Sequence, residues 1–536
     1  MAIRRAATSI GRPIRPTVKN TAVPASIGGV NALDPMVSMP PQDCIYCHNL
    51  MPSEYGMRLR KGYRQWSINL PSDVRTILPY DNQSGNNAKD RLFSICAEGI
   101  YDTTLFNTQT PTQVVNFANA VDDAGYGVYT SFTTDAAEQL ILYADAKNGL
   151  HQYDGQAETW TVPAITGADP TKVAFVTQHK QRIWVVEQDA ADGWYLPVDA
   201  IAGEALKFNF GSQFKHGGKL MGLWSWTVDG GDGVDDFLVA VSRAGDVLVY
   251  YGSDPSQSDW SLRGSYFIGE LPQSRRIAVS YGAELYLLST FGVISVRDLL
   301  NGVAASDPKV GPSAKIARFL RADVTANKDE YGWQLTVFPA DGFLHIVAPI
   351  ILGKTPRQYA MNLNTSAWGF WRDVRILGAD TWRGEYYMGS EAGVTLQYYG
   401  TLDGVELNDV EKGEPIDFEV LTTFQPYGQH AEWIRCELIR AVGVVGGGTS
   451  INIDAVFDYN VNPDIIAPPV SGALNPSLWD EALWDVDVWD FPPTAASAVQ
   501  GVFGMGRTMA VGMRGNSQSR ITLIAWDVIY NTGGLF

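Results

Sequence analysis

Hydrophobic and polar residues follow a pattern that returns along the chain between about residue 90 and residue 400. In each copy an apolar run of strand length is followed by a short turn with Gly or Asp, and then by a second apolar run. This order predicts a β-hairpin, and its return roughly every 40 to 60 residues is typical of β-propeller blades. The seven copies are RLFSICAEGIYD (91–102), QLILYADAKNGLHQYD (139–154), RIWVVEQDAADGWYLP (182–197), FLVAVSRAGDVLVYYG (237–252), ELYLLSTFGVISVRD (284–298), FLHIVAPIILGKTPRQYAMNL (343–363) and EYYMGSEAGVTLQYY (385–399).

The chain on either side of these repeats has a different pattern. Residues 1–80 contain no hairpin copy; they begin with a basic arm and continue as extended segments punctuated by prolines. We assign residues 81–412 to the propeller. An acidic, turn-rich boundary precedes residues 413–536, where longer runs such as EWIRCELIRAVGVV predict an antiparallel sheet or sandwich. The expected fold is therefore mainly β, with a propeller and a second β-rich region.

One interruption of the repeats favours a helix. The stretch GPSAKIARFLRADVTANKDE (311–330) has apolar residues at Ile316, Phe319 and Leu320 and few β-branched ones. Ser313 is a suitable N-cap, because a serine hydroxyl can accept a hydrogen bond from a free backbone N–H of the first turn. We expect this helix on the rim of the propeller or projecting from it.

Composition and charge narrow the possible functions. The 536 residues are 45% hydrophobic, which is ample for packed cores. No apolar run approaches the roughly 18 residues of a membrane-spanning helix, and the amino terminus lacks the apolar core of a secretory signal. We therefore expect a soluble chain made in the cytoplasm. The net charge of −18 does not suit a clamp on duplex DNA, because phosphate binding needs clustered Lys and Arg.

The first 20 residues are the basic exception. They contain Arg4, Arg5, Arg12, Arg15 and Lys19 and no acidic residue. An arm of this kind could dock on an acidic partner surface or on nucleic acid, and the four arginines are candidate contacts to a partner subunit. A solvated, flexible tail is the alternative interpretation.

The four cysteines include a pair that resembles a cofactor motif. CIYCH at 44–48 fits the C-x-x-C-H pattern of covalent haem attachment. That attachment takes place outside the bacterial cytoplasm, and the sequence shows no export signal. A zinc site would need a second pair of ligands, but Cys96 and Cys436 are isolated in the sequence. We interpret Cys44 and Cys47 as a chance pair in an extended segment, and we predict no cofactor.

A second unusual segment is WDEALWDVDVWDF (479–491), with tryptophans at Trp479, Trp484 and Trp489. The spacing of five fits neither a strand nor a helix, so we predict an irregular loop. Three rings on a loop must be buried, either in the local core or against a neighbouring chain. These tryptophans are the second set of candidate contacts to another subunit.

No motif points to catalysis. The acidic stretch DGGDGVDD (229–236) lacks the spacing of a calcium loop and is better interpreted as a solvated turn. His151, His179 and His345 fall in or beside predicted blade strands, where a core or rim histidine is the ordinary reading. The sequence contains no nucleophile elbow, phosphate-binding loop or zinc-protease motif. We therefore predict no catalytic, cofactor-binding or metal-binding residues.

Three stretches of the chain resemble the tail nozzle or hub proteins of short-tailed bacteriophages (podoviruses). The first is GGVNALDPMVSMPPQD with NLMPSEYGMRLRKGY (28–63), and the second is AMNLNTSAWGFWRD with EYYMGSEAGVTLQYYGTLDGVE (360–406). The third is the closing stretch MRGNSQSRITLIAWDVIYNTGGLF (513–536). Their order along nearly the whole chain carries the similarity. The CIYCH pair departs from the family, in which it has no known role.

This resemblance implies a propeller of six to eight blades with an antiparallel β platform built from the N- and C-terminal segments. It also implies a structural virion protein, assembled in the host bacterial cytoplasm as a homohexameric ring at the distal end of the tail. Such a ring binds the tail adaptor and fibre or spike proteins, closes the channel, and conducts double-stranded DNA without sequence-specific contacts. Acidic channel walls would avoid adhesive phosphate contacts, and salt would keep their repulsion short-ranged.

Two other functions remain open at the level of the sequence. A propeller hydrolase or glycosidase would need polar groups that converge at the axis of the wheel. A cytoplasmic scaffold of the WD-repeat type would need a regular repeat signature, and the Trp-Asp pairs of this chain lie outside the repeats.

Overall fold

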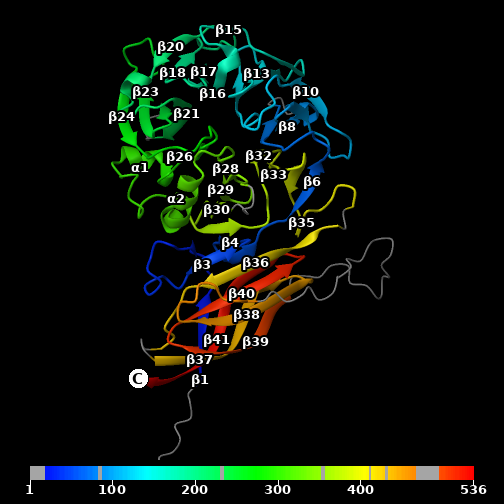
Figure 1. The fold of residues 1–536 in the computed structure, drawn as a ribbon, viewed down its shortest axis with the longest axis vertical. Coiled ribbons are helices and arrows are strands. Elements are labelled where there is room, and N and C mark those ends of the chain that lie inside the picture. Colours follow the sequence, from blue (N-terminus) through cyan, green and yellow to red (C-terminus); the bar gives the residue numbers. More distant parts are fainter. Residues whose placement is uncertain are drawn as a thin grey trace, which may run out of the picture.

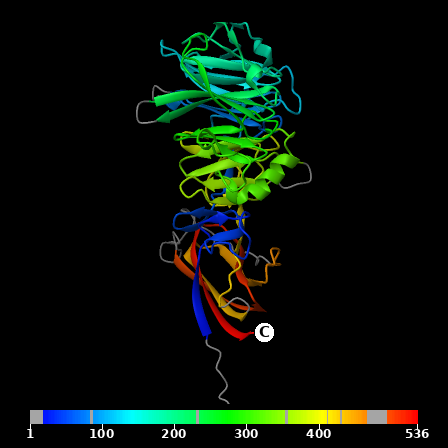
Figure 2. The ribbon, with the colours of Figure 1, turned by 90° about the vertical axis from the view of Figure 1, so that its left-hand side faces the viewer.

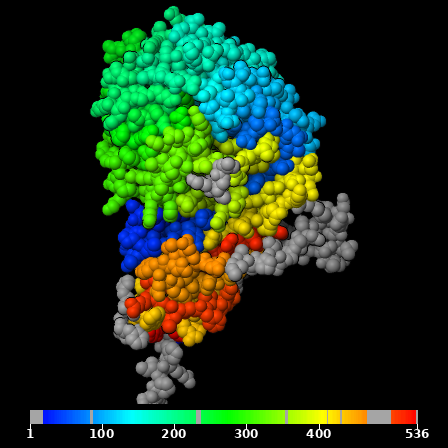
Figure 3. Space-filling model, in the orientation of Figure 1, coloured from blue at the N-terminus to red at the C-terminus, as the bar shows by residue number. Residues whose placement is uncertain are grey.

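The computed structural model describes residues 18–82, 87–229, 234–351, 357–409, 412–428, 432–465 and 494–535. A ring of small antiparallel sheets forms one end of the molecule, and a second β-rich domain forms the other end (Figure 1). In the space-filling view the dark blue N-terminal segment lies between these two parts (Figure 3). None of the described helices is long and apolar enough to span a bilayer.

The ring is a propeller with seven blades in the described residues, which confirms the predicted fold. Blades 1 to 3 are β7 (Thr76–Tyr80), β8 (Arg91–Cys96), β9 (Gly99–Asp102) and β10 (Thr112–Asn116); β11 (Val128–Thr133), β12 (Gln139–Asp145), β13 (Gly149–Asp154) and β14 (Thr159–Thr161); and β16 (Val173–His179), β17 (Arg182–Glu187), β18 (Asp192–Tyr195) and β20 (Leu206–Asn209). Blades 4 to 6 are β21 (Leu220–Asp229), β22 (Val234–Ser242), β23 (Asp246–Tyr251) and β24 (Ser261–Phe267); β25 (Ala278–Tyr281), β26 (Glu284–Ser289) and β27 (Gly292–Ser295); and β28 (Gln334–Phe338), β29 (Phe343–Val347), β30 (Gln358–Asn362) and β31 (Trp368–Trp371). A short parallel pair, β15 (Ile165–Thr166) and β19 (Gly203–Glu204), lies beside blade 3 in the sequence.

The local sequence explains the blades. In blade 4 the residues from Leu238 to Val241 are all buried, because blades stack against one another and cover both faces of each sheet. The turn between β22 and β23 contains Gly245 at a φ of +100°, and a Cβ there would lie 2.0 Å from the carbonyl oxygen of Gly269. A continuous apolar run followed by a turn with Gly therefore produces each hairpin.

Blade 7 is closed by a strand from the N-terminal region. Its order is β32 (Gly378–Trp382), β33 (Glu385–Gly389), β34 (Thr395–Tyr398) and then β6 (Tyr63–Ser67), which directly precedes blade 1 in the sequence. The propeller therefore begins near residue 63 and not at residue 81, as the sequence suggested. The difference arises because β6 has no hairpin partner next to it in the sequence, so the repeat pattern does not reveal it.

The second domain, here called the platform, consists of two sheets. One contains β39 (Thr494–Gly506), β37 (Glu432–Val445), β41 (Ile521–Leu535), β5 (Gly56–Leu59) and β4 (Leu50–Ser53), with β1 (Val18–Pro24) also paired to β41. The other contains β3 (Asp43–His48), β36 (Glu414–Thr422), β40 (Met509–Ser517) and β38 (Thr449–Phe457), with β2 (Gly29–Val30) and β35 (Leu402–Asp403) at its margins. Strands from the two chain ends run side by side along the platform (Figure 2).

The platform and propeller share one sheet. The outermost strand of blade 6, β31, meets β3 in a parallel bridge between Phe370 and His48, and β3 pairs with β36 of the platform. Arg60 lies at the same joint: its guanidinium is paired with Asp403 of β35, 2.5 Å between Nη2 and Oδ2, and it donates to the carbonyl oxygen of Arg372, which follows β31 of blade 6, at 3.3 Å. The two domains are therefore linked by backbone pairing as well as by side chains.

Helices lie beside blade 5. The short helix α1 (Val296–Leu300) follows β27, and α2 (Ala317–Ala326) follows the turn η4 (Ala314–Ile316). The helix expected at 311–330 is confirmed, but the N-cap role of Ser313 is wrong. Its hydroxyl accepts a hydrogen bond from the N–H of Val293, because η4 separates it from the first turn of α2. The remaining turns are η1 (Asn87–Lys89), η2 (Pro170–Lys172) and η3 (Gly211–Gln213).

Candidate functional sites at the propeller axis and on the platform

The first strand of every blade contributes to one cavity of about 500 Å³ at the axis of the propeller, here called the axial cavity. Polar side chains enter it from several blades, and aromatic rings form part of its wall. The lining includes Tyr129, Trp224, Arg275, Arg276, Tyr281 and Asp380.

Two arginines that directly precede β25 form part of this lining and connect blades. Arg276 donates hydrogen bonds to the carbonyl oxygens of Arg75 at 2.7 Å and Leu377 at 3.0 Å, in blades 1 and 7. Arg275 donates to the carbonyl oxygens of Met221 in blade 4 and Gln188 beside blade 3. The two guanidinium groups therefore hold five of the seven blades together around the axis.

The positive charge of these two arginines is buried and has no ion-pair partner among the described residues. Both side chains are less than a tenth exposed, and burial lowers the pKa of each guanidinium to about 10, so both stay charged at neutral pH. The face of Tyr126 lies 5.3 Å from the guanidinium of Arg276, where the ring quadrupole attracts a cation. Carbonyl dipoles and this ring are the groups that solvate the charge.

Asp380 is the one acidic residue among those that line the axial cavity. The hydroxyl of Tyr129 donates to its Oδ2 atom at 2.7 Å, and the N–H of Thr381 donates to its Oδ1 atom. Burial raises the pKa of Asp380 to about 6 despite these two hydrogen bonds and the charge of Arg276. Perturbed carboxyls in clefts mark candidate functional sites, but hydrolysis of a glycoside ordinarily uses a pair of carboxyls.

Arg275 also borders a second, much smaller cavity of about 30 Å³, together with Tyr126, Gln188 and Tyr331.

The three histidines named from the sequence lie in blade strands. His345 is fully buried, its Nδ1 atom lies 2.8 Å from the hydroxyl of Tyr386, and burial lowers its pKa to about 3. His179 contacts the hydroxyl of Ser225 at 3.0 Å, and its pKa falls to about 4 for the same reason. His151 packs near Phe117. All three are neutral parts of the propeller core at neutral pH.

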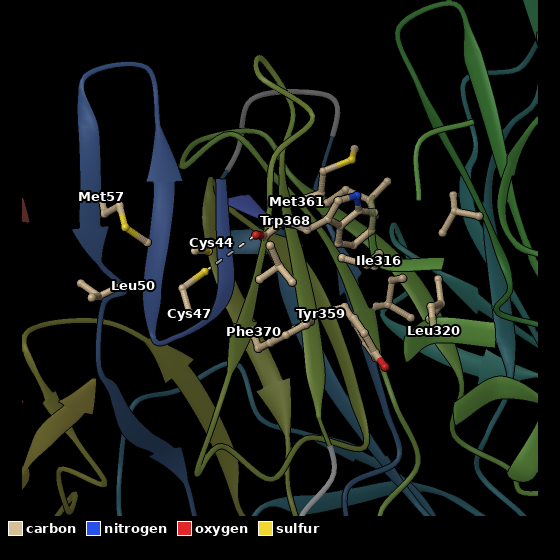
Figure 4. Close-up of a cluster of buried hydrophobic side chains, with 14 of the residues drawn as sticks. Cys44, Cys47, Leu50, Met57, Ile316, Leu320, Tyr359, Met361, Trp368 and Phe370 are labelled. Atoms are coloured by element: carbon tan, nitrogen blue, oxygen red, sulfur yellow. Dashed lines mark hydrogen bonds between the residues drawn. The ribbon is translucent and has the colours of Figure 1, made fainter. Parts of the chain in front are cut away.

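Cys44 and Cys47 both face the hydrophobic core (Figure 4). A β-bulge between Cys44 and Tyr46 gives the two thiols the same face, and the Sγ atom of Cys47 lies 3.8 Å from the carbonyl oxygen of Trp368. Burial raises the pKa of Cys44 well above its ordinary value, and His48 follows on the other face of the strand. In the described ranges no three His, Cys, Asp or Glu residues are grouped to hold a metal ion.

The other residues named from the sequence lie outside the described part of the chain. These are Arg4, Arg5, Arg12 and Arg15 in the arm and Trp479, Trp484 and Trp489 in the aromatic segment. The middle of the acidic stretch, residues 230–233, lies outside it as well.

The platform presents a surface that sequence reasoning missed. Phe503 is 85% exposed, Met505 59%, Val499 56% and Ile524 48%, on strands β39 and β41 of the same sheet. We call these four residues the platform patch. β37 lies between the two strands and places the exposed side chains of Arg435 and Arg440 opposite Met505 and Val499, so the continuous apolar part of the patch is the row Val499, Phe503 and Met505 along the edge strand β39. A signal was present in the sequence, because TAASAVQGVFGMG (494–506) contains no charge and no proline. Large exposed apolar patches mark interaction surfaces.

Comparison with known proteins adds little to this picture. No protein-family model matches the chain, and no curated protein matches it. The computationally designed Ika8 protein is 9% identical, covering 62% of this chain and 99% of its own, with a TM-score of 0.32. The WD40 domain of Neurospora crassa Pan2 is 10% identical, covering 63% and 96%, with a TM-score of 0.35. The seven-bladed arrangement therefore rests on the sheet topology of this chain itself.

Proposed function

We propose that this chain is the subunit of a ring-shaped tail nozzle, the distal part of the tail of a short-tailed bacteriophage. The observation that carries the proposal is the platform patch, because the three large apolar side chains exposed along the edge strand β39 favour burial against another chain. The sequence resemblance supplies the identity of the assembly. Two of its three stretches, 28–63 and 513–536, fall mostly in the platform, and the third, 360–406, spans blades 6 and 7 beside the joint.

In this proposal the platform forms the ring and the propeller stands on it. Six copies surround a lumen that conducts double-stranded DNA, and the ring contacts the tail adaptor on one side and fibre or spike proteins on its flank. With −18 on each chain, the ring repels phosphate at short range and lets the duplex slide.

The mass of the native protein tests the proposal. We expect light scattering to give a hexamer of about 350 kDa from chains of 58.7 kDa, either alone or when the neighbouring tail proteins are added. The variant Phe503→Asp places a charge in the platform patch and should shift the protein to the monomer at the same concentration. Leu105→Asp is the matched control, since Leu105 is 69% exposed on the rim of blade 1 and lies away from the platform.

Two outcomes would contradict the proposal. One is a wild-type protein that stays monomeric with every neighbouring tail protein. The other is a ring that forms equally well with Phe503→Asp, which would exclude the platform patch as the contact surface.

A further inference from the structure

We propose that the axial cavity is a binding site for an oxyanion, a carboxylate or phosphate group on a ligand or partner that reaches into the propeller. This site is independent of ring assembly.

The inference rests on the charges of the residues that line the cavity. Arg275 and Arg276 bring two buried positive charges to the cavity, and Asp380 is the one acid among its lining residues. The carboxylate of Asp380 is already held by the hydroxyl of Tyr129 and the N–H of Thr381, and it feels the charge of Arg276 without a direct ion pair to it among the described residues. A buried charge without an opposite partner is unfavourable, so a bound anion would be stabilised there.

Donor groups remain available for such a ligand. The two Nη atoms of Arg276 bond to Arg75, Thr76 and Leu377, whereas its buried Nε atom has no hydrogen-bond partner. Both ends of the guanidinium fork are therefore occupied by the protein, and the buried Nε–H of Arg276 is the donor left for an oxyanion beside the cavity that this residue lines.

The shape and surroundings of the cavity are consistent with ligand binding. Its volume of about 500 Å³ lies within the range of ordinary ligand sites, and Trp224 and Tyr281 contribute aromatic wall. Low-dielectric walls focus an electrostatic field along the axis of a cleft. Because the whole chain carries −18, a net positive lining is a local reversal of charge that favours an anion at this position over the outer surface.

The test is thermal unfolding of the full-length protein with added anions. Citrate and inorganic phosphate are titrated separately against sodium chloride at matched ionic strength. We expect at least one of them to raise the unfolding temperature with a saturating dependence on concentration, as a ligand of the native state does. A stronger effect of citrate indicates a carboxylate ligand, and a stronger effect of phosphate indicates a phosphate ligand.

Three variants make the test specific to the cavity. Asp380→Asn removes the negative charge with little change of shape and should tighten anion binding about three- to tenfold at pH 7.5. Arg276→Lys removes the Nε–H donor and should weaken binding about tenfold. Arg263→Gln, on the outer strand β24, is the control and should leave binding unchanged.

The proposal is overturned if neither anion produces a saturable shift. It is also overturned if Asp380→Asn binds anions no more tightly than the wild type. This second criterion remains decisive if Arg276→Lys fails to fold.

Discussion

At the scale of single residues, buried titratable groups give the propeller opposing responses to pH. His345 and His179 have pKa values lowered to about 3 and about 4 by burial, whereas the pKa of Asp380 is raised to about 6. A lowered histidine pKa contributes stability that is present above the unfolded value near 6.5 and is lost as the pH falls. A raised carboxyl pKa contributes stability that is present below about 3.8 and is lost as the pH rises through about 6.

His345→Gln tests the larger of these effects. The unfolding free energy of the wild type should fall by about 3 kcal/mol between pH 6.5 and pH 4 because of His345. Its fully buried imidazole is neutral in the folded protein and becomes charged on unfolding. The stability difference between the wild type and the variant should therefore shrink by that amount over this interval. Urea unfolding at each pH measures it, and a difference that is constant between pH 7 and pH 4 would contradict the assignment.

Asp380→Asn should show the opposite sign. The wild type loses the contribution of Asp380 as the pH rises from about 4 to about 6, whereas asparagine does not titrate. Since Asp380 is only half-buried, we expect the unfolding free energy of the variant, relative to that of the wild type, to increase by about 1–2 kcal/mol between pH 4 and pH 7. The same urea titrations measure it, and a variant that loses stability over this interval would contradict the assignment.

Residue-level chemistry could be predicted from the sequence only where a local pattern exists. The sequence placed His151, His179 and His345 in blade strands, because each lies inside an apolar run with β character. It gave no indication of Arg275 and Arg276 as axial residues. Their partners are carbonyl oxygens from four other blades, and such distant contacts leave no local pattern in the sequence.

At the scale of elements, the ring depends on one short strand from another part of the chain. β6 pairs with β34 from Tyr63 to Ser67, so blade 7 combines residues that are more than 300 positions apart. The N–H of Gln65 also bonds to the carbonyl oxygen of Val405 at 2.9 Å. This strand prevents blades 1 and 7 from separating, because its chain continues directly into β7.

Gln65→Pro tests this closure. Proline removes the N–H that donates to Val405, and its fixed φ distorts β6 and so weakens its pairing with β34; we expect a loss of about 3 kcal/mol in unfolding free energy. Gln65→Thr keeps the donor and a strand-compatible side chain, and it is the matched control. Urea unfolding measures both variants, and hydrogen exchange of β34 should rise in the proline variant alone. Equal stability of the two variants would show that β6 does not hold the ring closed.

Elements with local hairpins could be predicted, whereas elements completed by distant strands could not. The seven hairpin copies correspond to parts of the seven blades, since each pairs strands that are adjacent in sequence. The first boundary was misplaced because β6 and β7 precede the first copy. The sheet shared by β31, β3 and β36 was also beyond sequence reasoning, because its partners come from three separate regions of the chain.

At the scale of the whole molecule, the joint determines whether propeller and platform behave as one body. Arg60 follows β5 of the platform, and its side chain is 1% exposed. It bonds to both carboxylate oxygens of Asp403, and its Nε atom donates to Asn49 at 2.9 Å. The shared sheet, and the hydrogen bond from Arg60 to the carbonyl oxygen of Arg372 after blade 6, connect the two domains.

Asp403→Asn tests this joint. The substitution leaves the buried guanidinium of Arg60 without its carboxylate and should lower the unfolding free energy by about 3–5 kcal/mol. Glu406→Gln is the matched control, because Glu406 pairs with the exposed Lys412 at 2.6 Å, and an exposed pair contributes about 0–1 kcal/mol. Urea unfolding compares the two variants.

The variants Asp403→Asn and Glu406→Gln also distinguish a joint that only stabilises the fold from a joint that couples the two domains. If the joint couples them, hydrogen exchange in Asp403→Asn should rise on both sides of it, in β5 of the platform and in β34 of blade 7. In Glu406→Gln it should stay unchanged. A rise confined to β35 would mean that the shared sheet between β31, β3 and β36 holds the domains together without the ion pair. The propeller would then still follow the platform, and backbone pairing alone would transmit load between them.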